Sequence, residues 1–260
     1  QPAIDPHFDA QTFGFLTLGV GSYFSTHYYH TALLLVAGSR YVQIDLPSPY
    51  CKILSEAGEK VGLDLSPRRI DDYICTHVHG DHSNGCEDVA LYKFFSQRTR
   101  PNLYVLPEVA GPLWEQKLAA SLGGVTADDH APCPGASLET FFRVRTVVPE
   151  TPIQFGDVTM RIRRTRHAVP CFAMKFERAG KTLGYSCDTV YDPELIDWLS
   201  EADLIFHETT PSGPHTPYER LQALSPELKR KMVLIHLAEP LDGSDPWLRP
   251  AEQHAFYALA

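Results

Sequence analysis

One short stretch, residues 76–85 with the sequence THVHGDHSNG, constrains this chain more than any other. It follows the apolar run of residues 73–76, which is typical of a strand that ends in a polar turn. In an extended segment the side chains of His77 and His79 project to the same side and can reach one metal ion. Asp81 and His82 follow as the chain turns and can reach a second ion. The pattern therefore predicts a pair of metal ions, roughly 3.5–4 Å apart, that hold a hydroxide between them.

Chance clustering is the alternative, because the chain contains 12 histidines in 260 residues and a lone histidine is usually structural or solvated. Here, however, four good metal ligands occur together in the pattern His-x-His-x-Asp-His at the end of a predicted strand. The metal site is therefore the favoured interpretation, which the strand-to-turn context must confirm.

The same pattern resembles the signature of the metallo-β-lactamase superfamily. This resemblance implies three further ligands, each at a strand end: a third histidine, a bridging aspartate and a last histidine. His167, Asp188 and His236 follow predicted strands in the required order. Each of them alone would be interpreted as a structural residue. By the resemblance, one ion is bound by His77, His79 and His167, the other by Asp81, His82 and His236, and Asp188 bridges the two.

Imidazole and carboxylate ligands without thiolate suit two zinc ions, and manganese or iron is also compatible with these ligand types. Iron-oxidising relatives in the superfamily carry glutamate at the position of His79. The histidine in this chain therefore disfavours a redox function.

Further motifs resemble the ribonuclease Z branch of the superfamily. These are LGVGS at residues 18–22, HAVP at 167–170, YSCDT at 185–189, FHETT at 206–210 and HTP at 215–217. The resemblance implies that His215 protonates the leaving oxygen, that Glu208 orients His215, and that Asp81 also holds the attacking hydroxide. An alkoxide leaving group benefits from such a positioned acid. A solvated loop histidine remains the alternative for His215.

Two departures from this branch argue against a tRNA substrate. The long Gly/Pro-rich arm and the Pro-x-Lys-x-Arg-Asn segment of tRNA-processing members have no counterpart. The formal charge of −9, from 23 basic and 32 acidic residues, also disfavours binding to a nucleic-acid polymer, which needs clustered Lys and Arg. Relatives that lack the arm cleave small phosphodiesters, including cyclic nucleotides and cyclic phosphates of sugars, and these substrates fit better.

Substrate contacts can be predicted only weakly. Four arginines lead into His167, and Arg166 is the candidate for phosphate recognition among Arg161, Arg163, Arg164 and Arg166. A solvated or salt-bridged strand face explains most of them equally well. By the resemblance, an aromatic loop approaches the site, and its side chains could stack on a base. Core packing or surface exposure is the alternative for each of these side chains, which are Tyr23, His27, Tyr28, Tyr29 and His30.

The order of the predicted elements, two strand-rich halves that each carry helices, suits an α/β fold of two packed sheets with helices outside. The resemblance implies that this fold is the αββα four-layer sandwich of the metallo-β-lactamase superfamily. The predicted strands are residues 13–21, 31–37, 40–46, 73–76, 102–106, 141–148, 158–164, 171–176, 182–186, 203–206 and 232–235. The predicted helices are residues 50–58, a short one from 66, 89–95, 108–122, 193–199 and 217–224. Residues 132–135 are predicted to form a turn.

Composition indicates one domain over residues 1–260, because neither a repeat nor a compositional break divides the chain. No run of 18 apolar residues predicts a membrane span. Six scattered cysteines favour reduced thiols and a cytoplasmic location, although a removed leader would be compatible with the missing initial Met. Relatives are often homodimers, which is the expected assembly if the chain is not a monomer.

Together these features predict a dinuclear-metal phosphodiesterase that attacks a small or cyclic phosphodiester with a metal-bound hydroxide. The alternatives are an ester, thioester or lactone hydrolase, a ribonuclease Z-like RNA-processing nuclease, and, last, a non-catalytic metal-binding protein.

Overall fold

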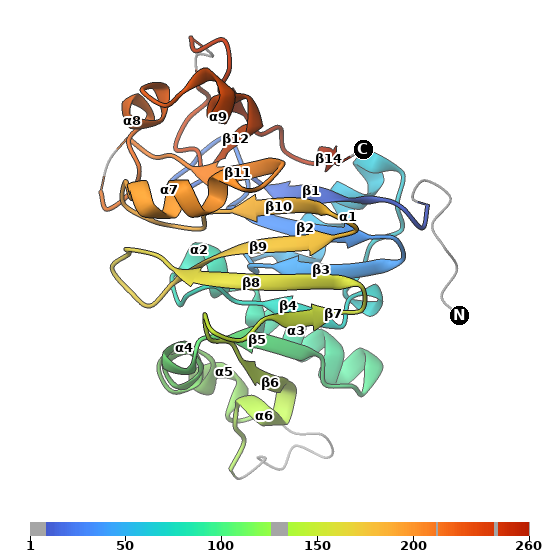
Figure 1. Ribbon diagram of the computed structural model, residues 1–260. Coiled ribbons are helices and arrows are strands. Elements are labelled where there is room, and N and C mark those ends of the chain that lie inside the picture. Colours follow the sequence, from blue (N-terminus) through green and yellow to red (C-terminus); the bar gives the residue numbers. More distant parts are fainter. Residues whose placement is uncertain (1–8, 126–134, 212, 242–243, 260) are drawn as a thin grey trace.

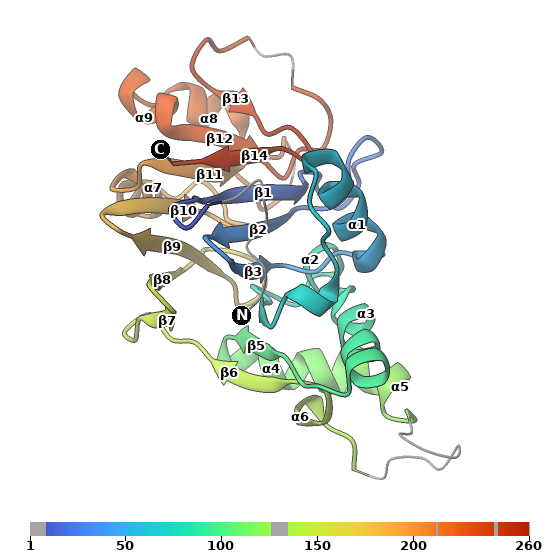
Figure 2. The ribbon, with the colours of Figure 1, turned by 90° about the vertical axis from the view of Figure 1, so that its right-hand side faces the viewer.

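Two seven-stranded sheets pack face to face, and helices cover their outer faces (Figures 1 and 2). The structure is a computed structural model that describes residues 9–125, 135–211, 213–241 and 244–259. The predicted αββα sandwich is therefore confirmed. None of the helices in these described segments is long and apolar enough to cross a membrane.

The first sheet has the strand order β14-β1-β2-β3-β4-β5-β6. Neighbouring strands from β14 to β3 in this order pair antiparallel, whereas those from β3 to β6 pair parallel. Every residue of the apolar strand β2 is buried, as expected of a strand that is covered on both faces. The strands are β1 (Phe13–Gly19), β2 (Ala32–Ala37), β3 (Arg40–Ile44), β4 (Asp72–Ile74), β5 (Asn102–Val105), β6 (Arg143–Thr146) and β14 (Phe256–Ala258).

The second sheet has the strand order β13-β12-β11-β10-β9-β8-β7. Strands β7 to β10 are antiparallel neighbours, whereas β10 to β13 are parallel. The strands are β7 (Ile153–Phe155), β8 (Val158–Arg164), β9 (Phe172–Arg178), β10 (Lys181–Tyr185), β11 (Leu204–Glu208), β12 (Met232–Ile235) and β13 (Arg249–Pro250).

Helices form the two outer layers. Helices α1 and α3 cover the first sheet, and α7, α8 and α9 lie outside the second (Figure 2). The helices are α1 (Tyr50–Val61), η1 (Pro67–Arg69), α2 (Gly80–Ser83), α3 (Cys86–Leu91), η2 (Tyr92–Gln97), α4 (Pro107–Leu113), η3 (Trp114–Leu118), α5 (Ala119–Leu122), α6 (Leu138–Phe141), α7 (Pro193–Ser200), α8 (Tyr218–Gln222) and α9 (Pro226–Lys231).

Aromatic rings fill the space between the sheets. Phe15 of the first sheet meets Phe176 and Phe206 of the second edge to face, with ring centroids 5.9 and 5.4 Å apart. Such pairs stabilise a core beyond the area that they bury. The contact fixes the two sheets relative to each other and so fixes the strand ends that carry the site.

Three sequence predictions need correction. The strand predicted over residues 141–148 begins only at Arg143, because Ser137 and Thr140 form a capping box that places Phe141 in α6. The helix predicted over residues 108–122 is split into α4, π-helical η3 and α5; Pro112 lies inside it and lacks the amide hydrogen of a regular helix. The short elements β7, β13, β14 and α9 were not predicted. The turn predicted at residues 132–135 lies mostly outside the described residues.

Candidate metal centre

Strand ends from both sheets converge on one group of side chains. The stretch after β4 carries the His-x-His-x-Asp-His motif and forms α2, and His167, Asp188 and His236 follow β8, β10 and β12. Helix α2 and the loop between β8 and β9 lie together at the left edge of Figure 1. The structure thus brings together all seven side chains that the sequence analysis assigned to metal binding.

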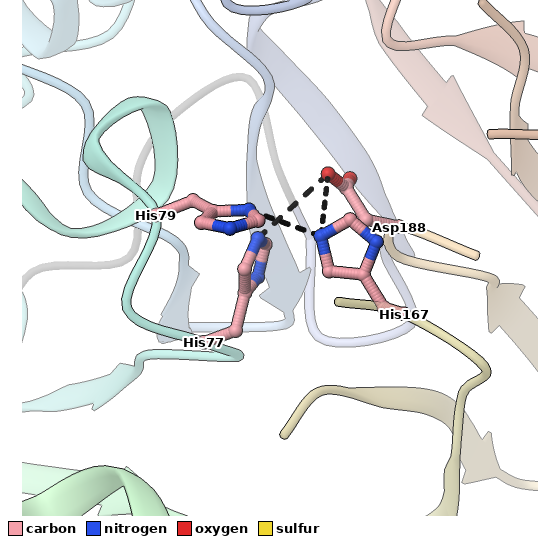
Figure 3. Close-up of side chains that lie close together, drawn as sticks. All are labelled: His77, His79, His167 and Asp188. Atoms are coloured by element: carbon pink, nitrogen blue, oxygen red, sulfur yellow. Dashed lines mark hydrogen bonds and ion pairs between the residues drawn. The ribbon is translucent and has the colours of Figure 1, made fainter. Parts of the chain in front are cut away.

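The first group joins three histidines and one carboxylate (Figure 3). The ligand atoms of His77, His79, His167 and Asp188 all lie within 4.8 Å of one another. His79 Nδ1 and His167 Nε2 are 3.0 Å apart, and Asp188 Oδ2 is 3.7 Å from His77 Nε2 and from His167 Nε2.

The second group shares Asp188 with the first and adds Asp81, His82 and His236. Asp188 Oδ1 is 3.3 Å from His82 Nε2, and Asp188 Oδ2 is 3.5 Å from His236 Nε2. Asp81 Oδ2 approaches the same two nitrogens to 3.3 and 3.2 Å. Asp188 therefore stands between the two groups, as expected of a bridging ligand.

These residues fit a divalent metal cofactor. Within the described residues the buried atoms His77 Nε2, His82 Nε2 and Asp188 Oδ1, which face these groups, have no hydrogen-bond partner, which is costly unless another ligand satisfies them. Ligand atoms about 2.0–2.1 Å from a tetrahedral ion lie roughly 3.3–3.4 Å from each other, close to the separations seen here. A divalent metal is therefore the cofactor that this donor set suits.

The protonation states agree with metal binding in the first group. Burial holds the pKa of His77 well below its usual value and lowers the pKa of His167 to about 4, so both rings are neutral and can offer a lone pair. Burial alone would raise the pKa of Asp188. The neighbouring His236 and His82 outweigh it and hold the pKa of this carboxyl well below its usual range.

Further residues hold the ligands in place, and the sequence analysis did not assign them. Asp45 Oδ2 accepts a hydrogen bond of 2.8 Å from His82 Nδ1, and its Oδ1 accepts bonds from the amide and hydroxyl of Thr76. Thr210 Oγ1 lies 3.1 Å from His236 Nδ1. Carboxylate–histidine pairs of this kind fix the tautomer and direction of a metal ligand. The only sequence signal was that Asp45 stands at the end of a predicted strand.

Backbone geometry also distinguishes this site. His236, Cys187 and Asp45 have φ values of 62°, 50° and 58°, in the left-handed region that non-glycine residues rarely occupy. One of them is a predicted ligand, one directly precedes Asp188, and one orients His82. Residues in such conformations gather at functional sites, where the surrounding structure holds them.

His215 and Glu208 lie against the metal groups. The His215 ring stacks on that of His236, with centroids 4.9 Å apart, and its Nδ1 is 3.3 Å from Glu208 Oε1. Glu208 is fully buried at the end of β11, and its Oε1 also accepts hydrogen bonds from the amides of Thr189 and Thr216. Burial raises the pKa of Glu208. The pair that the sequence analysis singled out is thus in contact, beside the proposed ligands.

The arginines before His167 mostly form surface ion pairs. Arg161 pairs with Glu177, Arg163 with Glu194 and Arg164 with Glu108, at 3.4, 3.0 and 2.7 Å, and Arg166 is exposed. The salt-bridged strand face is therefore the better interpretation of the first three.

The residues of the aromatic loop have different surroundings. Tyr28 and Tyr29 pack against the core, the Tyr29 hydroxyl donates a hydrogen bond to Glu56, and His27 Nε2 lies 2.8 Å from Glu239 Oε2 at the surface. His30 Nε2 donates a hydrogen bond of 3.1 Å to the carbonyl oxygen of Tyr23.

Solved structures share this fold. The metallo-β-lactamase fold protein YhfI from Bacillus subtilis superposes with a TM-score of 0.70 and 16% identity, covering 95% of this chain and 100% of YhfI. Human tRNase Z, short form, gives a TM-score of 0.67 and 18% identity, with 94% of this chain and 98% of the human chain covered. Fold and site therefore define a protein of the metallo-β-lactamase fold with a group of potential metal ligands, as the sequence predicted.

Sequence comparison gives the particular family. The profile of the family described as "Anti-Pycsar protein Apyc1" matches residues 13–257, and the chain belongs to this family. The Anti-Pycsar protein Apyc1 of Paenibacillus sp. (strain J14) is 29% identical over 93% of this chain and 97% of its own length. The cGMP-dependent 3′,5′-cGMP phosphodiesterase A of Dictyostelium discoideum is 23% identical, and the match covers 97% of this chain but 29% of that longer protein.

Proposed function

We propose that this protein is a metal-dependent phosphodiesterase that hydrolyses a 3′,5′-cyclic nucleotide. One observation carries the mechanism: the His215–Glu208 pair lies directly beside two groups of metal-binding side chains. The Dictyostelium relative is named for the same reaction on cyclic GMP. A phosphodiesterase needs both features, because the phosphate charge must be stabilised and an alkoxide must leave.

The metal centre is proposed to hold two ions, with zinc favoured by the ligand types. His77, His79 and His167 would hold one, Asp81, His82 and His236 the other, and Asp188 would bridge them. When bound, such a pair polarises a phosphoryl oxygen and lowers the pKa of a bound water to near neutral.

His215 is the proposed general acid. Its Nδ1 faces Glu208, which leaves Nε2 as the nitrogen that carries a proton to the leaving ribose oxygen. Glu208 cannot turn away, because two backbone amides donate to the same oxygen that faces His215. Its role is to hold the imidazole in one orientation, and the role of Asp81, besides binding metal, is to hold the attacking hydroxide.

The leaving group provides a test of this assignment. We expect His215→Ala to lower kcat for 3′,5′-cyclic GMP about 10²- to 10⁴-fold. The same variant should lose much less activity on bis(p-nitrophenyl) phosphate, because p-nitrophenolate leaves without a proton. Metal content per chain, counted by elemental analysis, should stay at the wild-type value, and Glu219→Gln, which changes an exposed acid on α8, serves as the control.

An equal loss on both substrates would remove His215 as the general acid. Wild-type protein with a full metal complement that cleaves only a lactone or a p-nitrophenyl ester would disprove the phosphodiesterase proposal. Salt-sensitive cleavage of RNA in place of cyclic GMP would indicate an RNA-processing nuclease instead.

A further inference from the structure

The aromatic loop, here residues 22–30, presents two large apolar rings to solvent. Tyr23 is 50% and Phe24 85% exposed; within the described segments only Phe95 and Trp247 join them as exposed large hydrophobic residues. The rings of Tyr23 and Phe24 lie together, with centroids 5.0 Å apart. Exposing such area to water is unfavourable, so an adjacent exposed pair of rings is a candidate surface for binding a ligand.

This loop borders the metal centre. Ser22 N donates a hydrogen bond of 3.0 Å to the carbonyl oxygen of Leu237, the residue after the ligand His236. On the other side, the Tyr23 ring lies close to Gly80 of the metal motif. The ring is so close that a Cβ atom built on Gly80 would be only 3.3 Å from Tyr23 Cε2. Gly80 separates the ligands His79 and Asp81 in the sequence. The two rings therefore stand at the rim of the site, next to the second metal group.

The loop is also held in one shape. Gly21 N donates to the Tyr29 carbonyl oxygen at 2.8 Å, and Thr31 N donates to that of Gly21 at 2.9 Å, which closes the base of the loop. The His30 ring stacks on Tyr23, with centroids 5.7 Å apart, while its Nε2 bonds the Tyr23 carbonyl oxygen. A preorganised platform binds a flat ligand at a smaller entropic cost than a mobile loop.

We propose that Tyr23 and Phe24 form a stacking platform for the base of the cyclic nucleotide. This inference rests on the proposed function, in which the phosphate sits at the metal centre and the base must extend toward its rim. Aromatic stacking tolerates different bases, because every base has a π-face. The contact would therefore supply affinity for a nucleotide without hydrogen bonds that select one base.

The test compares substrates with and without a base. We compare kcat/KM for 3′,5′-cyclic GMP with kcat/KM for methyl riboside 3′,5′-cyclic phosphate, and express the two as a ratio. This ratio is measured for wild type, Phe24→Ala, Tyr23→Ala and Tyr23→Leu. We expect the Phe24→Ala and Tyr23→Ala variants to lower this ratio about 5- to 50-fold, mainly through a higher KM for cyclic GMP. Tyr23→Leu keeps an apolar side chain beside Gly80 but loses the π-face, so it should also lower the ratio. Phe95→Ala, which removes an exposed ring from η2, should leave the ratio at the wild-type value.

Other outcomes separate this inference from the proposed function. Wild-type turnover of cyclic GMP with an unchanged ratio in Phe24→Ala and Tyr23→Ala would overturn the platform and leave the phosphodiesterase intact. A lower sedimentation coefficient for Phe24→Ala, with an unchanged ratio, would show that the rings contact a second copy of the chain instead. Wild-type failure on both cyclic phosphates would overturn the function and the platform together.

Discussion

Asp45 shows how one buried residue can set the direction of a proposed metal ligand, His82. Its carboxylate is fully buried, faces His82 Nδ1 at 2.8 Å, and is fixed by Thr76 from the strand end of the neighbouring β4. Because Nδ1 of His82 is engaged, Nε2 is the nitrogen that points at Asp81 and Asp188. Loss of the carboxylate would free this ring to rotate.

Asp45→Asn should therefore weaken metal binding at the second group. Asparagine tolerates the positive φ of 58° at this position, so the backbone should be preserved. We expect metal affinity to fall about 10- to 100-fold, measured by competition with a chromophoric chelator. Asp64→Asn, at an exposed position, is the matched control. Unchanged affinity in Asp45→Asn would show that His82 is held by other contacts.

At the scale of elements, the irregular helix from α4 to α5 supports the metal motif. Its π-helical segment η3 carries Lys117, whose ammonium group donates to the Val78 carbonyl oxygen, Ser83 Oγ and Asn84 Oδ1 at 2.9, 2.7 and 3.0 Å. In the sequence, these three acceptors flank Asp81 and His82, the proposed ligands of α2. Lys117 thus ties a short helix, which has few hydrogen bonds of its own, to a neighbouring element.

Lys117→Met should loosen this segment, because the replacement keeps the apolar stem but removes all three charge-assisted hydrogen bonds. We expect the free energy of unfolding of metal-free protein to fall by roughly 1–3 kcal/mol in urea denaturation. Metal affinity should fall as well. Gln116→Met makes the same replacement at an exposed neighbour and should have little effect. Equal stability of the two variants would contradict the role of Lys117.

At the scale of the whole molecule, the proposed metal centre brings together residues from the two sheets. Its motif follows β4 of the first sheet, whereas His167, Asp188 and His236 follow strands of the second. Bound ions would therefore stabilise the folded state in which both sheets are packed together. Phe15, Phe176 and Phe206 hold the same sheets from within the core.

Metal removal should lower thermal stability. A metal ion present at about 100 times its dissociation constant raises the free energy of unfolding by about 2.7 kcal/mol. For a chain of this size this corresponds to a Tm difference of roughly 5–10 °C. We expect EDTA to lower Tm by this amount and added zinc to restore it, measured by calorimetry. The difference should disappear in Asp188→Asn, which removes the shared ligand. If residues 1–260 form one domain, as proposed, each scan should show a single cooperative transition.

Features that depend on a few neighbouring residues could be predicted from the sequence, whereas features that depend on hydrogen-bond geometry or on distant contacts could not. The metal motif could be predicted because its four ligands share one strand end, and strand alternation and turn chemistry act over a few residues. His167, Asp188 and His236 could be assigned because each follows an apolar strand and their order resembles a known superfamily. The π-helical interruption at η3 and the capping box at Ser137 needed hydrogen-bond geometry that the apolar pattern does not contain.

Residue patterns and their resemblance to a known superfamily thus predicted the class of fold, the seven proposed ligands and the His215–Glu208 pair. Only the tertiary structure decided that Asp45 orients His82, that Lys117 holds α2, that three arginines face glutamates instead of a substrate, and that Tyr23 and Phe24 stand at the rim. Each of these depends on contacts between segments far apart in the chain. Such contacts follow from the packing of the two sheets, which local propensity and spacing do not specify.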